Sequence, residues 1–262
     1  MTQQQIQLKI ESFLKYADKR LLDSFPLPGG RMRLFAANPV SYACNYAVIN
    51  QWLDVDETIE AAEEEFLGRE ISPCRFYGAP DSVDLEQLRP AFARHGYSIK
   101  VMEQVHMMAL TRPACQVESA DCQLYWQQQE LSPQEQEFIL QNANGEFALQ
   151  HIQRELRRGC GKMLFAIQQE NLVAGLLYAE QADTAMLSDD YTKLDYNNFE
   201  LVQTMIVQAA TLCQSQGKKL LFARVKGQKA LKCYQTIGFE PIPTTPIWWA
   251  VKGKLPLWLE EQ

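Results

Sequence analysis

The sequence lacks most of the features that mark a membrane or secreted protein. None of its apolar runs approaches the roughly 18 residues that a membrane-spanning helix needs. The first residues, MTQQQIQLKIESFLKY, show no basic start followed by an apolar block and a small-residue cleavage site. They therefore do not resemble a secretory signal. We expect a cytoplasmic protein that does not act on a membrane.

Cysteine and histidine occur without the spacing that disulfide or metal frameworks require. The seven cysteines contain no C-x-x-C pair, and their odd number and irregular spacing favour free thiols in a reducing compartment. Only three histidines are present, and none stands at ligand spacing from a cysteine, so we expect no metal. The chain also has no Walker loop, the usual signature of nucleotide hydrolases, and no Ser-His-Asp order, the usual signature of serine hydrolases.

Positive charge is scarce, because 25 lysines and arginines stand against 32 aspartates and glutamates, for a net charge of −7. An acidic chain repels phosphate backbones, so we expect no nucleic-acid partner. The densest basic cluster is interleaved with apolar residues. It suits either a small phosphorylated ligand or the solvated side of a strand and a helix. Its members are Lys218, Lys219, Arg224, Lys226, Lys229 and Lys232.

The length of 262 residues suits two domains, and a polar stretch divides the chain. We assign residues 1–112 to an N-terminal module that begins with a helix. Residues 113–130 include the run Gln127-Gln128-Gln129, so we predict a linker there. Residues 131–262 form the predicted C-terminal module, which opens with a capping-box pattern, Ser132-x-x-Glu135.

The C-terminal module has the clearer pattern of elements, because its apolar residues switch between strand and helix periods. The predicted elements are a hairpin of strands at 163–169 and 172–180, a strand within 185–196, a helix at about 199–215, a strand at 219–225, a helix at 230–236 and a strand at 247–251.

The most specific segment is Ala230-Leu231-Lys232-Cys233-Tyr234-Gln235-Thr236-Ile237-Gly238-Phe239. It resembles the A-x-x-x-Y-x-x-x-G-F block of the GNAT superfamily of N-acetyltransferases, and the order of elements around it is similar to the second half of that fold. The resemblance implies an α/β (α+β) fold of GNAT-like modules, each a mixed, mostly antiparallel sheet flanked by helices. It also implies acetyl-CoA as the acyl donor and a small-molecule or peptide amine as the acceptor.

In the family, a glycine-rich loop before the long helix lets backbone N–H groups approach the CoA pyrophosphate. The resemblance places that loop at residues 197–202, but this sequence has no glycine between Gly175 and Gly217. Glu200 adds a negative charge beside the expected phosphates, although an acidic residue is also favoured in a first helical turn. The cofactor-binding residues that the resemblance implies are Leu194, Asn197, Asn198, Phe199, Glu200, Leu201, Val202, Arg224 and Ala230.

Tyr234 takes the position of the family's tyrosine that lies near the thioester sulfur and protonates the departing thiolate. A phenol with a pKa near ~10 suits that role. The alternative is that Tyr234 only packs an amphipathic helix under the final strand. The resemblance also implies that backbone N–H groups of the Leu187–Leu194 region polarise the carbonyl. No general base stands out, although three carboxylates lie near the third strand: Glu180, Asp189 and Asp190.

A fainter copy of the motif lies in the first half, at Leu88–Tyr97, with Phe92 at the position of Tyr234. We interpret the first half as a second, reduced GNAT module, as in tandem GNAT proteins, with chance as the alternative. In such proteins the reduced half shapes the acceptor pocket or a dimer contact. Residues that could line such a pocket, or fill the core instead, are Tyr42, Asn45, Tyr46 and Trp52.

Two functions remain open at this point. The first is an acyl-CoA-dependent N-acyltransferase, an N-acetyltransferase in the simplest case, and possible homodimerisation accompanies it. The second is a non-catalytic GNAT-like binding or regulatory protein that has lost acetyl-CoA binding. The missing glycines and Glu200 motivate the second.

Overall fold

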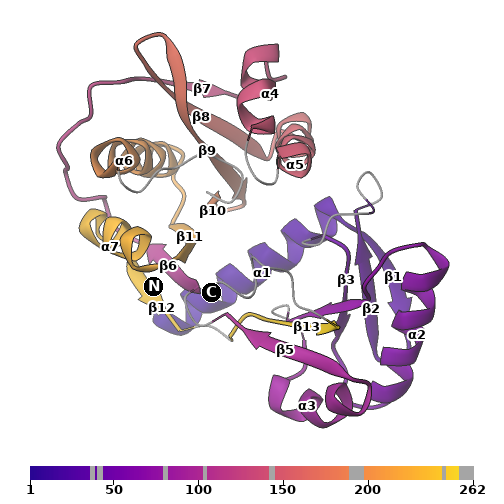
Figure 1. Cartoon of the computed structure of the whole chain (residues 1–262). Helices are drawn as coiled ribbons and strands as arrows, with labels where there is room; N and C mark the ends of the chain where they lie inside the picture. The colour runs from indigo at the N-terminus through magenta and orange to yellow at the C-terminus, as the bar shows by residue number, and fades with distance from the viewer. Residues whose placement is uncertain are drawn as a thin grey trace. The chain divides into compact units, whose positions relative to one another are not determined.

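The computed structural model describes residues 1–35, 39, 44–78, 82–102, 105–141, 145–188, 198–243 and 246–253, with only the backbone at 18–21 and 147. The chain divides into two compact units, each built around a β-sheet (Figure 1). We call Met1–Phe13 with Val105–Thr244 the C-module, and Leu14–Gln104 with Thr245–Gln262 the N-module. No described helix is long and apolar enough to cross a membrane.

The N-module contains a six-stranded sheet in the order β1-β2-β3-β4-β13-β5. Its elements are the second part of α1 (Gln3–Leu21), β1 (Asp23–Leu27), β2 (Gly30–Leu34), β3 (Tyr46–Ile49), α2 (Val55–Gly68), β4 (Arg75–Tyr77), α3 (Leu85–Arg94), β5 (Tyr97–Val101) and β13 (Trp248–Lys252). Strands β3 and β4 pair in parallel, and the other described pairs are antiparallel. One face buries Phe66 of α2 and Phe92 of α3 against Phe76 and Trp248.

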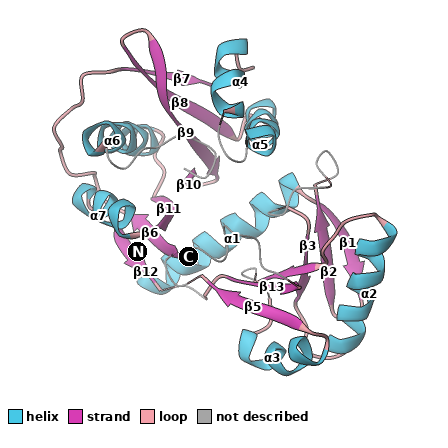
Figure 2. Ribbon diagram, viewed as in Figure 1, coloured by secondary structure: helices cyan, strands magenta, loops and turns pink. Residues whose placement is uncertain are grey.

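The C-module contains a seven-stranded sheet in the order β12-β6-β11-β10-β9-β8-β7 (Figure 2). Its elements are the first part of α1, β6 (Val105–Leu110), β7 (Gln123–Gln127), α4 (Pro133–Leu140), α5 (Gly145–Arg157), β8 (Gly161–Gln168), β9 (Asn171–Gln181), β10 (Thr184–Ser188), α6 (Phe199–Ser215), β11 (Leu220–Lys226), α7 (Gln228–Ile237) and β12 (Glu240–Ile242). Both sheets are mixed and mostly antiparallel with flanking helices, which confirms the predicted fold class.

Alternation along the C-module strands sends apolar side chains to both faces of the sheet. One face packs against α6 and α7, with Met205 of α6 and Tyr234 of α7 fully buried. The other face packs against α4 and α5 through Ile139 and Ile152, and Figure 1 shows these helices on the side opposite α6. Phe13 of α1 meets Phe222 of β11 edge-on, with ring centroids 5.1 Å apart.

The two halves of the chain exchange a strand. In the first half α3 is followed by β5 and β6, and in the second half α7 is followed by β12 and β13. The first strand of each pair stays in its own sheet, while the second joins the other sheet. As a result, β6 lies between β11 and β12, and β13 lies between β4 and β5. This matched order supports the interpretation of the first half as a second GNAT-like module.

The predicted module boundaries do not separate the two units. Residues 113–130 are not only a linker, because β7 pairs with β8 from Gln123↔Ile167 to Gln127↔Met163. The final strand, predicted within the C-terminal module, instead completes the N-module sheet. The consecutive strands β5 and β6 lie in different sheets. Sequence patterns predict where a strand lies, but the choice of sheet depends on long-range packing.

Candidate functional site

Two helices of the C-module follow the carboxyl ends of two neighbouring strands. Strands β10 and β11 are the parallel pair among the described strands of this sheet, in register from Thr184↔Leu220 to Leu187↔Ala223. Helix α6 follows the carboxyl end of β10, and α7 follows the carboxyl end of β11. Beyond Ala223, β11 continues to Lys226 without a described partner in β10. In open α/β sheets, ligands bind in the crevice outside such carboxyl ends.

The start of α6 contains most of the predicted cofactor-binding loop. Asn198 caps the helix, since its side-chain oxygen accepts a hydrogen bond from the Leu201 N–H at 3.4 Å. Glu200 is exposed in the first turn, Phe199 is half-buried, and Leu201 and Val202 are buried in the core. Of the predicted loop residues that the structure describes, only Asn198, Phe199 and Glu200 therefore have side chains that are not buried in the core. Leu194 and Asn197 lie outside the described residues.

The start of α7 is the more cationic of the two helix ends. Gly227 precedes the helix with φ +81°, a conformation that favours glycine. Lys226 and Lys229 on either side are exposed, and no acidic residue lies in the first turn. Ala230 is buried beneath them, 2% exposed, so its side chain contributes packing. Backbone amides of the first turn, which have no partner within the helix ladder, and the flanking lysines together favour a bound anion here.

The remaining predicted residues of this edge occupy two different faces. Arg224 is half-buried and alternates with Ala223 and Val225, so it lies on the face away from α6 and α7. Tyr234 lies on the face that α7 covers, fully buried, with its ring edge-on to Phe239 at 5.0 Å. This burial fits the packing interpretation of Tyr234, and its role as an acid stays a prediction.

Glu180 is not available as a general base at this edge. It pairs across the hairpin with Ala185, near the amino end of β10, away from the carboxyl ends. Its carboxylate accepts a hydrogen bond from Lys162 and forms an ion pair with Lys218 at 3.0 Å. Burial raises the pKa of the Glu180 carboxyl, but the two lysines outweigh it and hold the pKa below its usual value. Asp189 and Asp190 lie outside the described residues.

The predicted acceptor-pocket residues do not converge. Asn45 is fully buried, where its side chain accepts a hydrogen bond from the Phe35 N–H at 2.8 Å. Tyr46 is buried against Tyr77, with ring centroids 5.1 Å apart. Trp52 is 66% exposed, and Tyr42 lies outside the described residues. Asn45 and Tyr46 therefore act in the core, as the alternative predicted.

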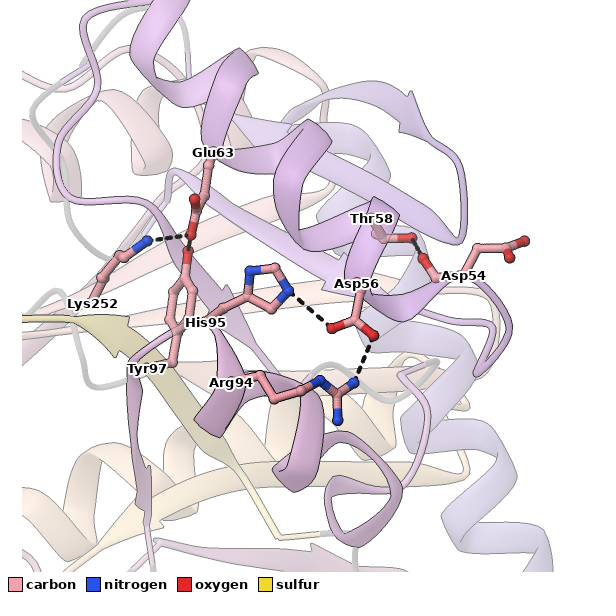
Figure 3. Close-up of polar contacts among 8 residues, drawn as sticks. All are labelled: Asp54, Asp56, Thr58, Glu63, Arg94, His95, Tyr97 and Lys252. Atoms are coloured by element: carbon pink, nitrogen blue, oxygen red, sulfur yellow. Dashed lines mark hydrogen bonds and ion pairs between the residues drawn. The ribbon is translucent and has the colours of Figure 1, made fainter.

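The corresponding edge of the N-module is acidic (Figure 3). Helix α2 follows β3 as α6 follows β10, but Asp54, Asp56 and Glu57 crowd its N-terminus. Asp56 accepts a hydrogen bond from Arg94 at 2.6 Å and lies 2.9 Å from the His95 ring nitrogen Nε2. The bond from Arg94 is the main reason that the pKa of Asp56 lies below its usual value. Three carboxylates repel phosphate, so the C-module edge is the better anion site.

The repeated motif carries its hydroxyl at different places in the two modules. In the C-module the helix supplies Tyr234, and Phe239 lies just before strand β12, whereas in the N-module the helix supplies Phe92 and strand β5 begins with Tyr97. The Tyr97 hydroxyl donates to Glu63 at 2.9 Å, and Lys252 of the exchanged strand β13 donates to the same oxygen at 3.0 Å (Figure 3). The N-module hydroxyl is thereby engaged in a structural contact.

His106, which no sequence motif indicated, lies at the same edge as the helix N-termini. It stands in β6 opposite Val225 of β11. The signal that identifies it is strand register, which a single sequence does not supply. Among the described residues, no group of three or more His, Cys, Asp or Glu side chains is placed to hold a metal ion.

Solved structures of N-acetyltransferases are similar to this chain. A GCN5-related N-acetyltransferase from Kribbella flavida has 12% sequence identity and a TM-score of 0.63, and the match covers 96% of this chain and 97% of that protein. A second, from Sphaerobacter thermophilus, has 13% identity and a TM-score of 0.58, covering 87% of this chain and 79% of that protein.

A tandem GNAT protein from the clavulanic acid biosynthesis pathway has 13% identity and a TM-score of 0.53, covering 87% of this chain and 80% of that protein. No protein-family model matches the chain, and no curated protein sequence matches it. At these identities the likeness establishes the fold: two GNAT-like modules in tandem.

Proposed function

We propose that the C-module is an acyl-CoA-dependent N-acyltransferase, an N-acetyltransferase in the simplest case, acting on a small-molecule or peptide amine in the cytoplasm. The observation that carries the proposal is the edge where β10 and β11 end and α6 and α7 begin. The GNAT fold of the solved N-acetyltransferases supports it at the level of the fold. A possible homodimer and the absence of nucleic-acid and membrane partners belong to the same proposal.

The helix N-termini supply the groups that would hold the CoA phosphates. Backbone amides in the first turn of α6 can donate to the pyrophosphate, and Lys226 and Lys229 offer positive charge nearby. Glu200 opposes this binding, because two like charges ~7 Å apart in water repel by about 0.6 kcal/mol. We therefore expect acetyl-CoA binding that is weaker than a glycine-rich loop would give.

The reaction would be direct transfer of the acyl group. The neutral amine attacks the thioester carbonyl, an N–C bond forms, and the C–S bond breaks as the tetrahedral intermediate collapses. Tyr234 is the proposed donor of the proton that the departing thiolate takes up. The phenol is then reprotonated by exchange with solvent.

The second candidate is a non-catalytic GNAT-like binding or regulatory protein. Two observations favour it: the exposed Glu200 beside the expected phosphates, and the complete burial of Tyr234. A protein of this kind would bind its partner through the fold and would not use the cofactor edge.

Thermal unfolding with and without millimolar acetyl-CoA, followed by titration calorimetry, separates the two candidates. Acetyl-CoA at 100 times its dissociation constant adds about 2.7 kcal/mol, a shift of several degrees. A variant with Lys226 and Lys229 changed to Gln should show a smaller shift, while the same change at exposed Lys15 serves as a control in the N-module. No shift and no heat in the unmodified protein would favour the non-catalytic candidate.

Tyr234→Phe then tests the proposed acid. We expect a lower rate of thiol release with unchanged stabilisation by acetyl-CoA. An unchanged rate would remove Tyr234 from the mechanism and leave it a core residue.

A further inference from the structure

We infer that His106 is the catalytic base of the C-module site, delivered by the strand that crosses from the first half of the chain. This inference rests on the proposed acyltransferase function and extends it to a residue outside the C-terminal half. It assigns the exchanged strand β6 a chemical role in addition to its structural one.

Strand register places His106 at the open edge of the sheet. Strand β6 is antiparallel to β11, with Leu110 opposite Leu221, Met108 opposite Ala223 and His106 opposite Val225. The first two pairs lie in the core that α6 and α7 cover. Because side chains alternate along a strand, His106 lies on this same face. Val225, the residue opposite His106, lies beyond Ala223, which is the last residue of β11 that pairs with β10.

Helix α7 brings Tyr234 to the same face. Val225, opposite His106, belongs to the core cluster that contains Tyr234 and Ala230 of α7. The proposed acid and the proposed base therefore come from two elements that flank the end of β11. Acid–base transfer of an acyl group requires this kind of arrangement, with one group for the leaving thiolate and another for the attacking amine.

The ring of His106 is available for proton transfer. The side chain is half-buried and makes no hydrogen bond to any residue that the structure describes. His95, by contrast, is held by Asp56 at 2.9 Å, and His151 is buried. The charged or titratable groups on the neighbouring elements are Arg224 and Lys226 of β11, Lys229, Lys232, Cys233 and Tyr234 of α7, and Glu240 of β12.

The proposed reaction moves two protons, one from the amine and one to the thiolate. As the amine nitrogen bonds to the acyl carbon, a ring nitrogen of His106 accepts the proton that the amine loses. The electron pair of the breaking C–S bond leaves with sulfur, and the thiolate takes its proton from Tyr234. Imidazole is the side chain that gives and takes protons most readily near neutral pH, so it suits the base.

Chemical modification tests the position of His106 without knowledge of the acceptor. Diethyl pyrocarbonate acylates accessible neutral histidines, and mass spectrometry reports each site separately. We expect saturating acetyl-CoA to slow modification of His106 at least several-fold and to leave His95 unchanged as the internal control. Equal modification of His106 with and without acetyl-CoA, in protein that acetyl-CoA stabilises, would overturn the inference alone.

The variant His106→Asn tests the proton transfer, with His95→Asn as the matched control. Thiol release from acetyl-CoA is followed over pH with a panel of polyamine, aromatic, amino-sugar and peptide amines. We expect His106→Asn to keep its stabilisation by acetyl-CoA, to lose roughly 10²-fold or more in rate, and to lose the acid limb of the pH profile. An unchanged rate and profile would overturn the role of His106. No stabilisation of the unmodified protein by acetyl-CoA would overturn the proposed function, and this inference with it.

Discussion

Glu180→Gln tests whether the carboxylate at the amino end of β10 is structural. The side chain of Glu180 is 16% exposed, and those of its partners Lys162 and Lys218 are 13% and 15% exposed. Glutamine keeps the shape and one acceptor but removes the charge. Two largely buried ammonium groups then face each other without a carboxylate.

The size of the expected loss of stability depends on how deeply the ion pairs are buried. Exposed ion pairs contribute about 0.2–1 kcal/mol, whereas removing one partner of a buried pair costs about 3–5 kcal/mol. Because all three side chains are mostly buried, we expect a loss of about 3 kcal/mol in the free energy of unfolding, or roughly 6–12 °C in the melting temperature of the protein. The folded-state pKa of Glu180 is lowered, so this stabilisation is present above the unfolded value of 4.5 and is lost as pH falls through the folded pKa.

Calorimetric unfolding at pH 7 and at stepwise lower pH measures both effects. Glu240→Gln is the matched control, because Glu240 also forms an ion pair at 3.0 Å, with Arg112, but both side chains are more than 60% exposed. That change should cost less than about 1 kcal/mol. Equal losses in the two variants, or a loss in Glu180→Gln that persists at low pH, would refute the argument from burial.

Three further changes probe the fold and the cofactor edge. Gly227→Ala should destabilise the protein by about 1–2 kcal/mol in urea unfolding, because the backbone φ of +81° is unfavourable for alanine even though no atom lies within 4 Å of the added carbon. The control Gly68→Ala, at an open site in α2 without positive φ, should be neutral or stabilising. Glu200→Gln should tighten acetyl-CoA binding a few-fold in calorimetry, with a gain that shrinks as salt rises, and a salt-independent gain would point to another cause. Tyr97→Phe should lower the free energy of unfolding by about 1 kcal/mol, because it removes the hydrogen bond to Glu63. An unchanged melting temperature would show that this bond does not stabilise the fold.

Local signals in the second half predicted its elements well. The helix expected at about 199–215 is α6, Phe199–Ser215, and the capping box at Ser132 and Glu135 is present at the start of α4. The strand expected at 219–225 is β11, Leu220–Lys226. These elements have strong apolar periods and clear glycine or serine boundaries, so short-range information is sufficient to find them.

The destinations of strands were not predictable from those signals. Strand β7 was mistaken for part of a linker because the glutamine run that follows Trp126 was taken as the mark of a loop, and because the strand itself is only partly buried. Nothing in the pattern of Trp248–Lys252 or Val105–Leu110 distinguishes one sheet from the other, since both segments are simply apolar and extended. Pairing partners are fixed by the packing of the whole chain.

The order of the elements around the candidate site was predicted in part. The sequence places a helix after each of the segments that form β10 and β11, and the structure shows that these two strands are neighbours. The roles assigned to Tyr234 and to the loop before α6 stay predictions. Glu180 was considered for the site because it is close in sequence to β10. Closeness in sequence does not show that Glu180 lies near the amino end of β10 and not near the carboxyl end. His106 was missed because it lies more than a hundred residues from Val225, its neighbour across the sheet.

The reciprocal strand exchange has a consequence for biosynthesis. A ribosome releases the N-terminal residues first, but the sheet that they begin lacks its inner strand β13 until Trp248–Lys252 emerge. The gap separates β4 from β5, so the early chain carries two unpaired strand edges throughout the synthesis of the second half. Neither half is therefore an independent folding unit, and recombination that divides the gene between the modules would leave each product without a central strand.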